Sequence, residues 1–326
     1  MSTEPAARAT PSWVGPQGER TDRLELHLSY RCPNRCLFCS EAHRMGEFGE
    51  LTLSLDQVEQ VLRAHQKRGI VRLHLTGGEP TIHEQFVAVA RLAKQLGMGT
   101  SVGTNGVMLG QEPFARRALP HLDEVMFSLH GPDAAVHDGL TRRVGSFAQV
   151  TAALGLARRL APQIGSFVNI VVTRLNLAVL GDTVSLAADL GASLIVLSNP
   201  TPEGRALDRY EELAVPLADL AEILPTIPAR AAGAVVRFFG VPMCILGPQE
   251  TLSNDLHWDP RVTVEWARAP GKAVLKSVYT WSPARLRCHA EPCDGCLKRT
   301  VCMGVFDGAH DLFSMAALHP QRGDDP

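Results

Sequence analysis

Short apolar runs alternate with amphipathic stretches between residues 24 and 200. The apolar runs fall at 24–28, 71–75, 100–103, 125–129, 167–172 and 194–197. The stretches at 55–67, 85–96, 113–118, 147–160 and 177–190 carry apolar residues at helical spacing. Ser54 and Gln57 are spaced as a capping box at the start of the first of these helices. Strand–helix alternation at this interval predicts βαβ units with right-handed crossovers. We therefore predict an α/β fold in which a parallel sheet curls into a partial (β/α)6 TIM-like barrel.

The pattern changes after residue 199. One more strand-like run lies at 235–239, and residues 240–270 are rich in Pro, Gly, Asn and Asp, with a possible hairpin strand at 262–266. We predict a flexible tail at 1–23, a barrel domain at 24–239, a small Cys-rich extension at 240–318 and a polar tail at 319–326.

Composition and charge narrow the classes of protein. Of 326 residues, 45% are hydrophobic and 20% are charged, which excludes wholesale disorder. The net charge of -2 makes a nucleic-acid partner unexpected. No apolar stretch is long enough to span a membrane, and the N-terminal segment lacks the apolar region of a secretory signal. We therefore expect a cytoplasmic protein that does not bind membranes.

The eight cysteines are clustered, and in a reducing compartment clustered cysteines bind metal more often than they form disulfides. Cys32, Cys36 and Cys39 follow the first predicted strand. This spacing lets one loop hold an iron–sulfur cluster, in which three thiolates leave the fourth iron open. The alternative is a zinc site, which normally needs a fourth protein ligand, such as His43 or a residue elsewhere.

A Cys-x3-Cys-x2-Cys loop after the first strand of an α/β barrel resembles the radical S-adenosylmethionine (SAM) superfamily. The resemblance implies a 4Fe–4S cluster held by Cys32, Cys36 and Cys39, with SAM bound to the open iron. It also implies that the reduced cluster cleaves SAM to a 5′-deoxyadenosyl radical, which abstracts a hydrogen atom from the substrate. An external electron donor such as flavodoxin or ferredoxin would then be required.

Further matches follow the next strands. Residues 76–80, TGGEP, resemble the family's GGEP motif, and residues 104–106, TNG, resemble its third-strand turn. The resemblance implies that SAM contacts Phe38, Gly78, Glu79, Asn105 and Ser128. Because these motifs follow separate strands in order, and active sites lie at the carboxyl face of such barrels, the matches support one another. They cover about residues 24–200 and leave the substrate and its acid–base residue unidentified. Asn169 is a weaker match to a polar SAM contact, and His130 and His137 lie near the same predicted mouth.

The second group of thiols comprises Cys288, Cys293, Cys296 and Cys302, with Cys244 further upstream. A Cys-x2-Cys pair is also typical of zinc knuckles, which is the alternative. The spacing from Cys293 to Cys302 is similar to the core of the SPASM extension of radical SAM enzymes. No cysteine follows Cys302, so the pattern favours one auxiliary 4Fe–4S cluster, as in the shorter twitch extension. We assign Cys244, Cys293, Cys296 and Cys302 as its ligands and hold Cys288 in reserve.

These features predict a radical SAM enzyme for oxidation or bond formation. Only 23 residues precede the first strand, too few for a folded leader-binding module. We therefore expect a small biosynthetic metabolite as substrate in preference to a peptide. The alternatives are a radical SAM maturase of a ribosomal peptide and a non-catalytic metal-binding protein with structural zinc sites.

Overall fold

The computed structural model describes residue 18 and residues 20–323, so most of the predicted N-terminal tail and residues 324–326 lie outside the described part. Its main sheet has the strand order β7-β6-β5-β4-β3-β2-β1-β8-β9. Neighbouring strands are parallel except β8 and β9, which are antiparallel. The strands are β1 (Arg23–Ser29), β2 (Arg72–Gly77), β3 (Gly99–Thr104), β4 (Glu124–Ser128), β5 (Gly165–Val171), β6 (Leu194–Ser198), β7 (Val235–Phe239), β8 (Arg261–Ala269) and β9 (Lys272–Thr280), with a separate short pair β10 (Arg287–Cys288) and β11 (Val305–Phe306).

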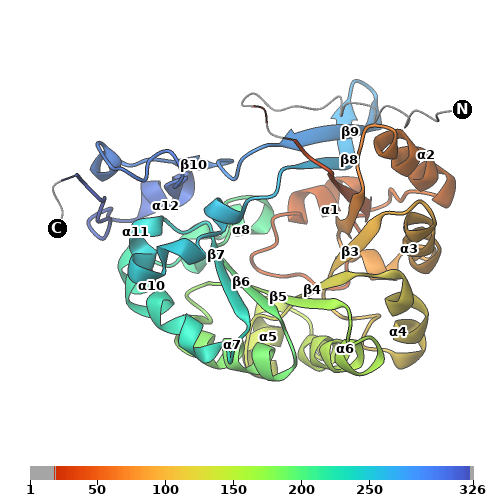
Figure 1. The fold of residues 1–326 in the computed structure, drawn as a ribbon, viewed down its shortest axis with the longest axis horizontal. Helices are drawn as coiled ribbons and strands as arrows, with labels where there is room; N and C mark the ends of the chain where they lie inside the picture. Colours follow the sequence, from red (N-terminus) through yellow and green to blue (C-terminus); the bar gives the residue numbers. More distant parts are fainter. Residues whose placement is uncertain (1–17, 19, 324–326) are drawn as a thin grey trace, which may run out of the picture.

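Helices cover the outer face of the curved sheet (Figure 1). The first long helix begins with the predicted capping box, because the Ser54 side chain accepts from the Gln57 N–H and the Gln57 side chain from that of Ser54. The helices are α1 (Ala42–Phe48), α2 (Leu55–Gln66), α3 (Phe86–Gln95), α4 (Glu112–Ala118), α5 (Ala134–Thr141), α6 (Ser146–Leu160), α7 (Leu180–Asp189), α8 (Gly204–Asp208), α9 (Tyr210–Leu213), α10 (Leu217–Ile223), α11 (Met243–Leu246) and α12 (Asp307–Leu312). Among the described residues, no helix is long and apolar enough to cross a bilayer.

Buried and half-buried residues alternate along the strands, and this alternation distinguishes the hydrophobic core from the barrel interior. In β5, Ser166, Val168 and Ile170 are buried, and Val168 and Ile170 belong to the main hydrophobic core. The residues between them, such as Phe167 and Asn169, are only half-buried. Because successive side chains of a strand point to opposite faces, these half-buried residues face the inside of the barrel. The predicted α/β partial barrel is confirmed.

The predicted hairpin strand at 262–266 is part of a longer hairpin, and its second strand, β9, was not predicted. Pro270 and Gly271 form the two-residue loop, in which Gly271 has a positive φ of 74° that this turn requires. The first strand, β8, pairs in parallel with β1 and places Val262 opposite Leu24. An ion pair between Glu25 and Arg261, 2.6 Å apart, joins the same two strands. The hairpin therefore extends the barrel sheet past β1, and the domain boundary near residue 240 stays a prediction.

Candidate active site

The first group of thiols lies on the loop between β1 and α1, at the carboxyl edge of the sheet. Cys32, Cys36 and Cys39 are all half-buried and free. Burial raises the pKa of Cys32 to about 12 and raises the pKa of Cys36 and Cys39, and the neighbouring thiols add to the increase for Cys32 and Cys36. The Cys39 N–H donates to the Cys36 carbonyl at 3.3 Å, so the loop turns between these two thiols. In the absence of metal the thiols are protonated, so metal binding must release protons.

The backbone of this loop is held from two sides. On one side, the N–H groups of Arg35 and Leu37 donate to the carbonyl groups of Thr141 and Leu140 at the end of α5, each at 2.9 Å. These bonds fix the middle of the loop.

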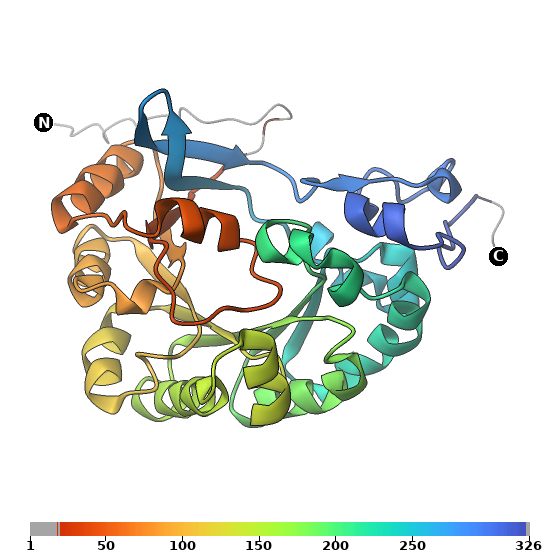
Figure 2. The ribbon, with the colours of Figure 1, turned by 180° about the vertical axis from the view of Figure 1, so that it is seen from behind.

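On the other side, the start of α8 packs against the loop, and Figure 2 shows α8 beside α1 over the barrel mouth. The Arg205 N–H donates to the Cys39 carbonyl at 2.9 Å, and the Arg205 guanidinium donates to the Cys36 carbonyl at 2.7 Å. A Cβ on Gly204 would lie 2.5 Å from the Cys39 carbonyl oxygen and closer still to that of Ser40. Only glycine permits this approach. Sequence reasoning missed both residues, whose only signal is a Gly-Arg pair after the sixth strand.

The TGGEP turn lies directly against the thiol loop. The Gly78 N–H donates to the Ser29 carbonyl at 2.9 Å, and the Glu79 N–H donates to the Arg31 carbonyl at 2.8 Å. A Cβ on Gly78 would lie 2.7 Å from the carbonyl carbon of Arg31, so this glycine is required by close backbone packing. The turn therefore sets the position of the residue just before Cys32.

The Glu79 carboxylate is almost fully buried, with 1% of the residue exposed. Its Oε1 accepts from the Thr81 N–H at 3.0 Å, from the Thr81 hydroxyl and from the Thr104 hydroxyl at 2.8 Å. Its Oε2 accepts from the Asn105 N–H at 2.6 Å. Burial raises the pKa of Glu79 overall, although these four hydrogen bonds oppose the increase. The Asn105 side chain in turn donates to the Cys32 sulfur at 3.6 Å. The second and third motifs are thus joined to the thiol loop.

Polar side chains lie at the carboxyl ends of the next strands. Ser128 is half-buried at the end of β4 and pairs in register with Asn169 of β5. The Ser198 hydroxyl of β6 donates to Asn169 Oδ1 at 2.6 Å, which orients the amide. The structure therefore brings Ser128 and Asn169 together on the edge that also carries the thiol loop.

Phe38 packs edge-on against His130, with ring centroids 4.6 Å apart, and His130 stacks on His137. Both imidazoles are buried and use Nδ1 to accept a backbone N–H, from Val171 and His130 respectively. Each ring therefore carries its proton on Nε2 when neutral. Burial lowers the pKa of His137 to about 4 and that of His130 well below its usual value. His130 therefore packs against the thiol loop through Phe38, His137 packs behind His130, and both rings are neutral.

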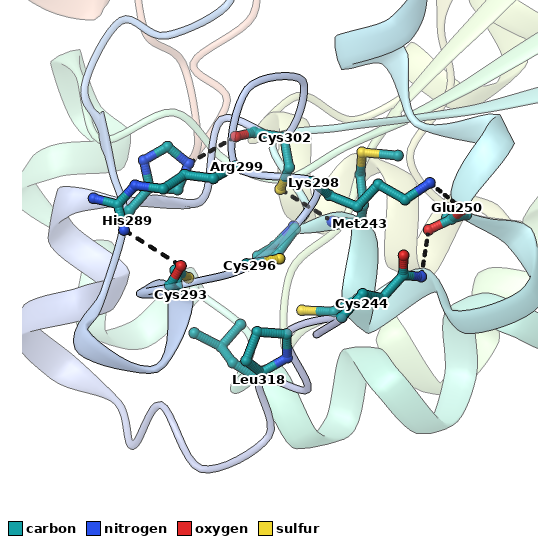
Figure 3. A pocket seen from close by; sticks show the side chains of 13 residues that line it. Met243, Cys244, Glu250, His289, Cys293, Cys296, Lys298, Arg299, Cys302 and Leu318 are labelled. Atoms are coloured by element: carbon teal, nitrogen blue, oxygen red, sulfur yellow. Dashed lines mark hydrogen bonds and ion pairs between the residues drawn. The ribbon is translucent and has the colours of Figure 1, made fainter. Parts of the chain in front are cut away.

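The second group of thiols surrounds a separate pocket beside β7. Figure 3 shows Cys244 of α11 and Cys293, Cys296 and Cys302 of the loop between β10 and β11 around this pocket. Burial, together with the other three thiols, raises the pKa of Cys244 to about 11. The Met243 N–H donates to the Cys302 sulfur at 3.4 Å. The structure thus brings the four predicted ligands to one place, and the donor set, four thiols, fits an iron–sulfur cluster.

Cys288 does not line this pocket. It lies on β10, where burial and a hydrogen bond with Asp307 raise the pKa of its thiol to about 11.

Among the described residues, no group of three or more His, Cys, Asp or Glu side chains is arranged to hold a single metal ion.

A cavity of about 210 Å³, here called the mouth cavity, opens between β1, β8 and the loop after β6. Glu41, two residues after Cys39, lines it together with His27. Glu41 Oε2 lies 3.8 Å from His27 Nδ1, and neither buried atom has a hydrogen-bond partner among the described residues. Burial raises the pKa of Glu41 to about 7 and lowers that of His27 to about 4. Sequence reasoning missed Glu41, because a glutamate after a cysteine loop carries no motif.

Comparison with known families decides the class of this barrel. The model of the radical SAM superfamily matches residues 26–187, which include the thiol loop, Glu79 and Ser128. Residues 26–187 form a radical SAM domain. The predicted resemblance is therefore confirmed. The match ends within α7, before the thiols that follow β7.

Two curated relatives of this chain have informative names, of which the first states a peptide substrate. "PqqA peptide cyclase" of Rhodopseudomonas palustris is 34% identical over 206 residues, which cover 63% of this chain and 53% of that protein. "Mycofactocin maturase MftC" of Mycobacterium ulcerans is 33% identical over 191 residues, covering 58% of this chain and 50% of that protein. The chain thus spans about half the length of the curated relatives it matches.

Solved structures resemble nearly the whole chain. The structure "Native anSMEcpe with bound AdoMet and Cp18Cys peptide" matches with a TM-score of 0.59 and 14% identity, covering 92% of this chain and 93% of that chain. At this identity the likeness shows the fold alone, which includes the region beyond the radical SAM domain.

The prediction of a small-metabolite substrate and partner is wrong. A relative that is 34% identical to this chain over 206 residues is an enzyme named for its peptide substrate. The prediction depended on the short segment ahead of β1, and the length of that segment does not report what the barrel accepts.

Proposed function

We propose that this chain is a radical SAM enzyme that acts on a peptide and oxidises it or forms a new bond within it. The observation that carries the proposal is the loop of Cys32, Cys36 and Cys39, held next to Glu79 at the carboxyl end of a radical SAM barrel. The peptide class is supported by the relative named PqqA peptide cyclase.

We assign Cys32, Cys36 and Cys39 as ligands of a 4Fe–4S cluster with one open iron. Such a cluster, when bound and reduced, would supply the electron that cleaves SAM to methionine and a 5′-deoxyadenosyl radical able to take a hydrogen atom from the substrate. The chain's own contribution is to position the thiolates. Arg205 holds two carbonyl groups of the loop, and Asn105 donates to the Cys32 sulfur. Burial raises the pKa of Cys36 and Cys39, and the charge of Arg205 opposes part of that increase.

We assign the amino group of SAM to Glu79. Its Oε1 already accepts three hydrogen bonds, whereas its Oε2 accepts one among the described residues and so has capacity for another. A carboxylate bonded to an ammonium gives a strong, charge-assisted interaction. We assign the remaining SAM contacts to Phe38, Gly78, Asn105 and Ser128, with Gly78 acting by close packing because its N–H is already bonded.

We assign Cys244, Cys293, Cys296 and Cys302 as ligands of one auxiliary 4Fe–4S cluster, with Cys288 in reserve. The support is the shared pocket of the four thiols and the separate environment of Cys288 beside Asp307. Such a cluster can accept an electron from a substrate radical, which suits a net oxidation. We also infer a cytoplasmic location, because all eight cysteines are free.

The test begins with anaerobic purification and reconstitution with iron and sulfide. We expect a brown protein that forms 5′-deoxyadenosine from SAM when dithionite is added, and the Cys32→Ala/Cys36→Ala/Cys39→Ala variant should form none. A colourless protein with stoichiometric zinc, or SAM cleavage by the triple variant, would contradict the assignment.

The substrate class is tested with a peptide fraction of cell extract. We expect this fraction to increase 5′-deoxyadenosine formation, and prior protease treatment should remove the increase. Stimulation that survives the protease would exclude a peptide.

A further inference from the structure

A second cavity, of about 390 Å³, lies inside the barrel, and we call it the chamber. It extends from Glu124 and Leu194, at the amino ends of β4 and β6, to Ser198 and Phe239, at the carboxyl ends of β6 and β7. In a closed (β/α)8 barrel, layers of side chains fill this volume. Here the interior is open, so the barrel can hold part of a ligand.

The two walls of the chamber differ in chemistry. The wall formed by β4 to β7 is apolar along its length, with Met126, Phe167, Leu194, Val196 and Phe239, and carries the polar Glu124 and Ser198 at its two ends. The five apolar side chains are half-buried, because they face the cavity and not the helices. The wall formed by β1 to β3 is polar, with Arg23, His74 and Ser101.

The chamber adjoins the mouth cavity. Phe239, Trp258 and Arg261 line both cavities. The ring of Phe239 stacks on that of Trp258 at 6.5 Å between centroids, and the Arg261 guanidinium lies 4.2 Å from the Trp258 ring. Trp258 Nε1 is buried and has no hydrogen-bond partner among the described residues. An indole N–H left in this state points to an acceptor that a ligand brings.

We propose that the chamber receives one aromatic side chain of the substrate, while the backbone next to it lies in the mouth cavity beside Glu41. An apolar cavity of about 150 Å³ is large enough to bind benzene. The chamber therefore has room for an aromatic ring and its connection to the backbone. Its aromatic and thioether side chains, from Phe167, Phe239, Trp258 and Met126, favour a ring over an aliphatic chain. The identity of this ligand as part of a peptide rests on the proposed function.

The test uses 4-fluorotoluene, an aromatic side-chain analogue, with the purified, reconstituted chain. Binding is followed by broadening of the 19F resonance. Val196→Phe fills the chamber, whereas Val235→Phe makes the same change at an exposed position of β7 that does not line it. We expect wild type and Val235→Phe to bind the probe equally and Val196→Phe to bind it at least tenfold more weakly. Absence of binding by wild type, or equal binding by all three, would overturn the proposal.

A second variant replaces Val196→Phe if that variant does not fold. Leu194→Phe fills the chamber from the same face of β6, two residues earlier, and thermal unfolding identifies which variant is native. The readout needs no radical chemistry. Probe binding without 5′-deoxyadenosine formation would keep the chamber and refute the proposed function. SAM cleavage without probe binding would keep the proposed function and refute the role of the chamber.

Discussion

Gly204→Ala tests whether α8 positions the thiol loop. Gly204 has a φ of 56°, a conformation that costs an alanine roughly 1–2 kcal/mol. In addition, the new Cβ would lie 2.5 Å from the Cys39 carbonyl oxygen, and real Cβ contacts essentially never fall below 3.0 Å. The backbone that carries Cys39 must therefore move, which costs about 1–3 kcal/mol more. We expect a total loss of about 2–5 kcal/mol in the free energy of unfolding.

Two matched controls separate these effects. Gly145 also has a positive φ, 84°, but its Cβ would meet nothing within 4 Å, so Gly145→Ala should show the conformational cost alone. Gly155, in the middle of α6, has neither constraint, and Gly155→Ala should stabilise the chain by about 0.5–1 kcal/mol. The excess cost of Gly204→Ala over Gly145→Ala then measures the overlap with the thiol loop.

The assay combines chemical unfolding, iron content and SAM cleavage. Two 4Fe–4S clusters require about eight irons per chain. We expect Gly204→Ala to lose the irons of the first cluster, to keep those of the auxiliary cluster and to form little 5′-deoxyadenosine. Gly145→Ala should keep both clusters. Full iron content and normal SAM cleavage in Gly204→Ala would show that α8 does not set the geometry of the loop.

Three further predictions address other parts of the site. Glu79→Ala should weaken SAM binding by about 1.5–3 kcal/mol, the contribution of a charge-assisted hydrogen bond, while the cluster survives; unchanged SAM affinity in isothermal titration would exclude this role. Cys293→Ser should lose the auxiliary irons and Cys288→Ser should keep them, so equal iron loss in both would contradict our choice of ligands. The pKa of His137 is lowered to about 4, so the folded chain protonates this residue only near pH 4, whereas the unfolded chain protonates it below about pH 6.5. Stability should therefore fall from pH 6.5 to 5, and His137→Asn should abolish about 1.5 kcal/mol of that fall, as urea unfolding at the two pH values would show.

The barrel could be predicted because its information is local. The strands from β1 to β7 and the longest helices after β1 to β5 give short periodic signals, and the motifs that mark the carboxyl ends, such as Glu79 and Asn105, are contiguous in sequence. The same holds for the capping box of Ser54 and Gln57, whose partners are three residues apart.

Features that depend on distant partners could not be predicted. Gly204 and Arg205 act on Cys36 and Cys39, more than 160 positions away, and no local pattern reveals such a contact. Strand β9 was missed because its side chains are mostly half-exposed and lack a clear alternation. The predicted substrate class was wrong for a different reason: it was inferred from the length of the segment ahead of β1, which carries no information on what the barrel binds.

The pairing of β8 with β1 has a consequence for the order in which the chain folds. The Thr21 hydroxyl donates to the Pro260 carbonyl, 239 positions further along, so the second edge of β1 is completed by a contact of very high sequence separation. Such contacts form late, and during synthesis the amino-terminal strands leave the ribosome well before their distant partner. The thiol loop would then meet its partners on α5 and α8 while one flank of the barrel is still open. We expect iron delivery to Cys32, Cys36 and Cys39 to be faster during this interval than after β8 has paired with β1.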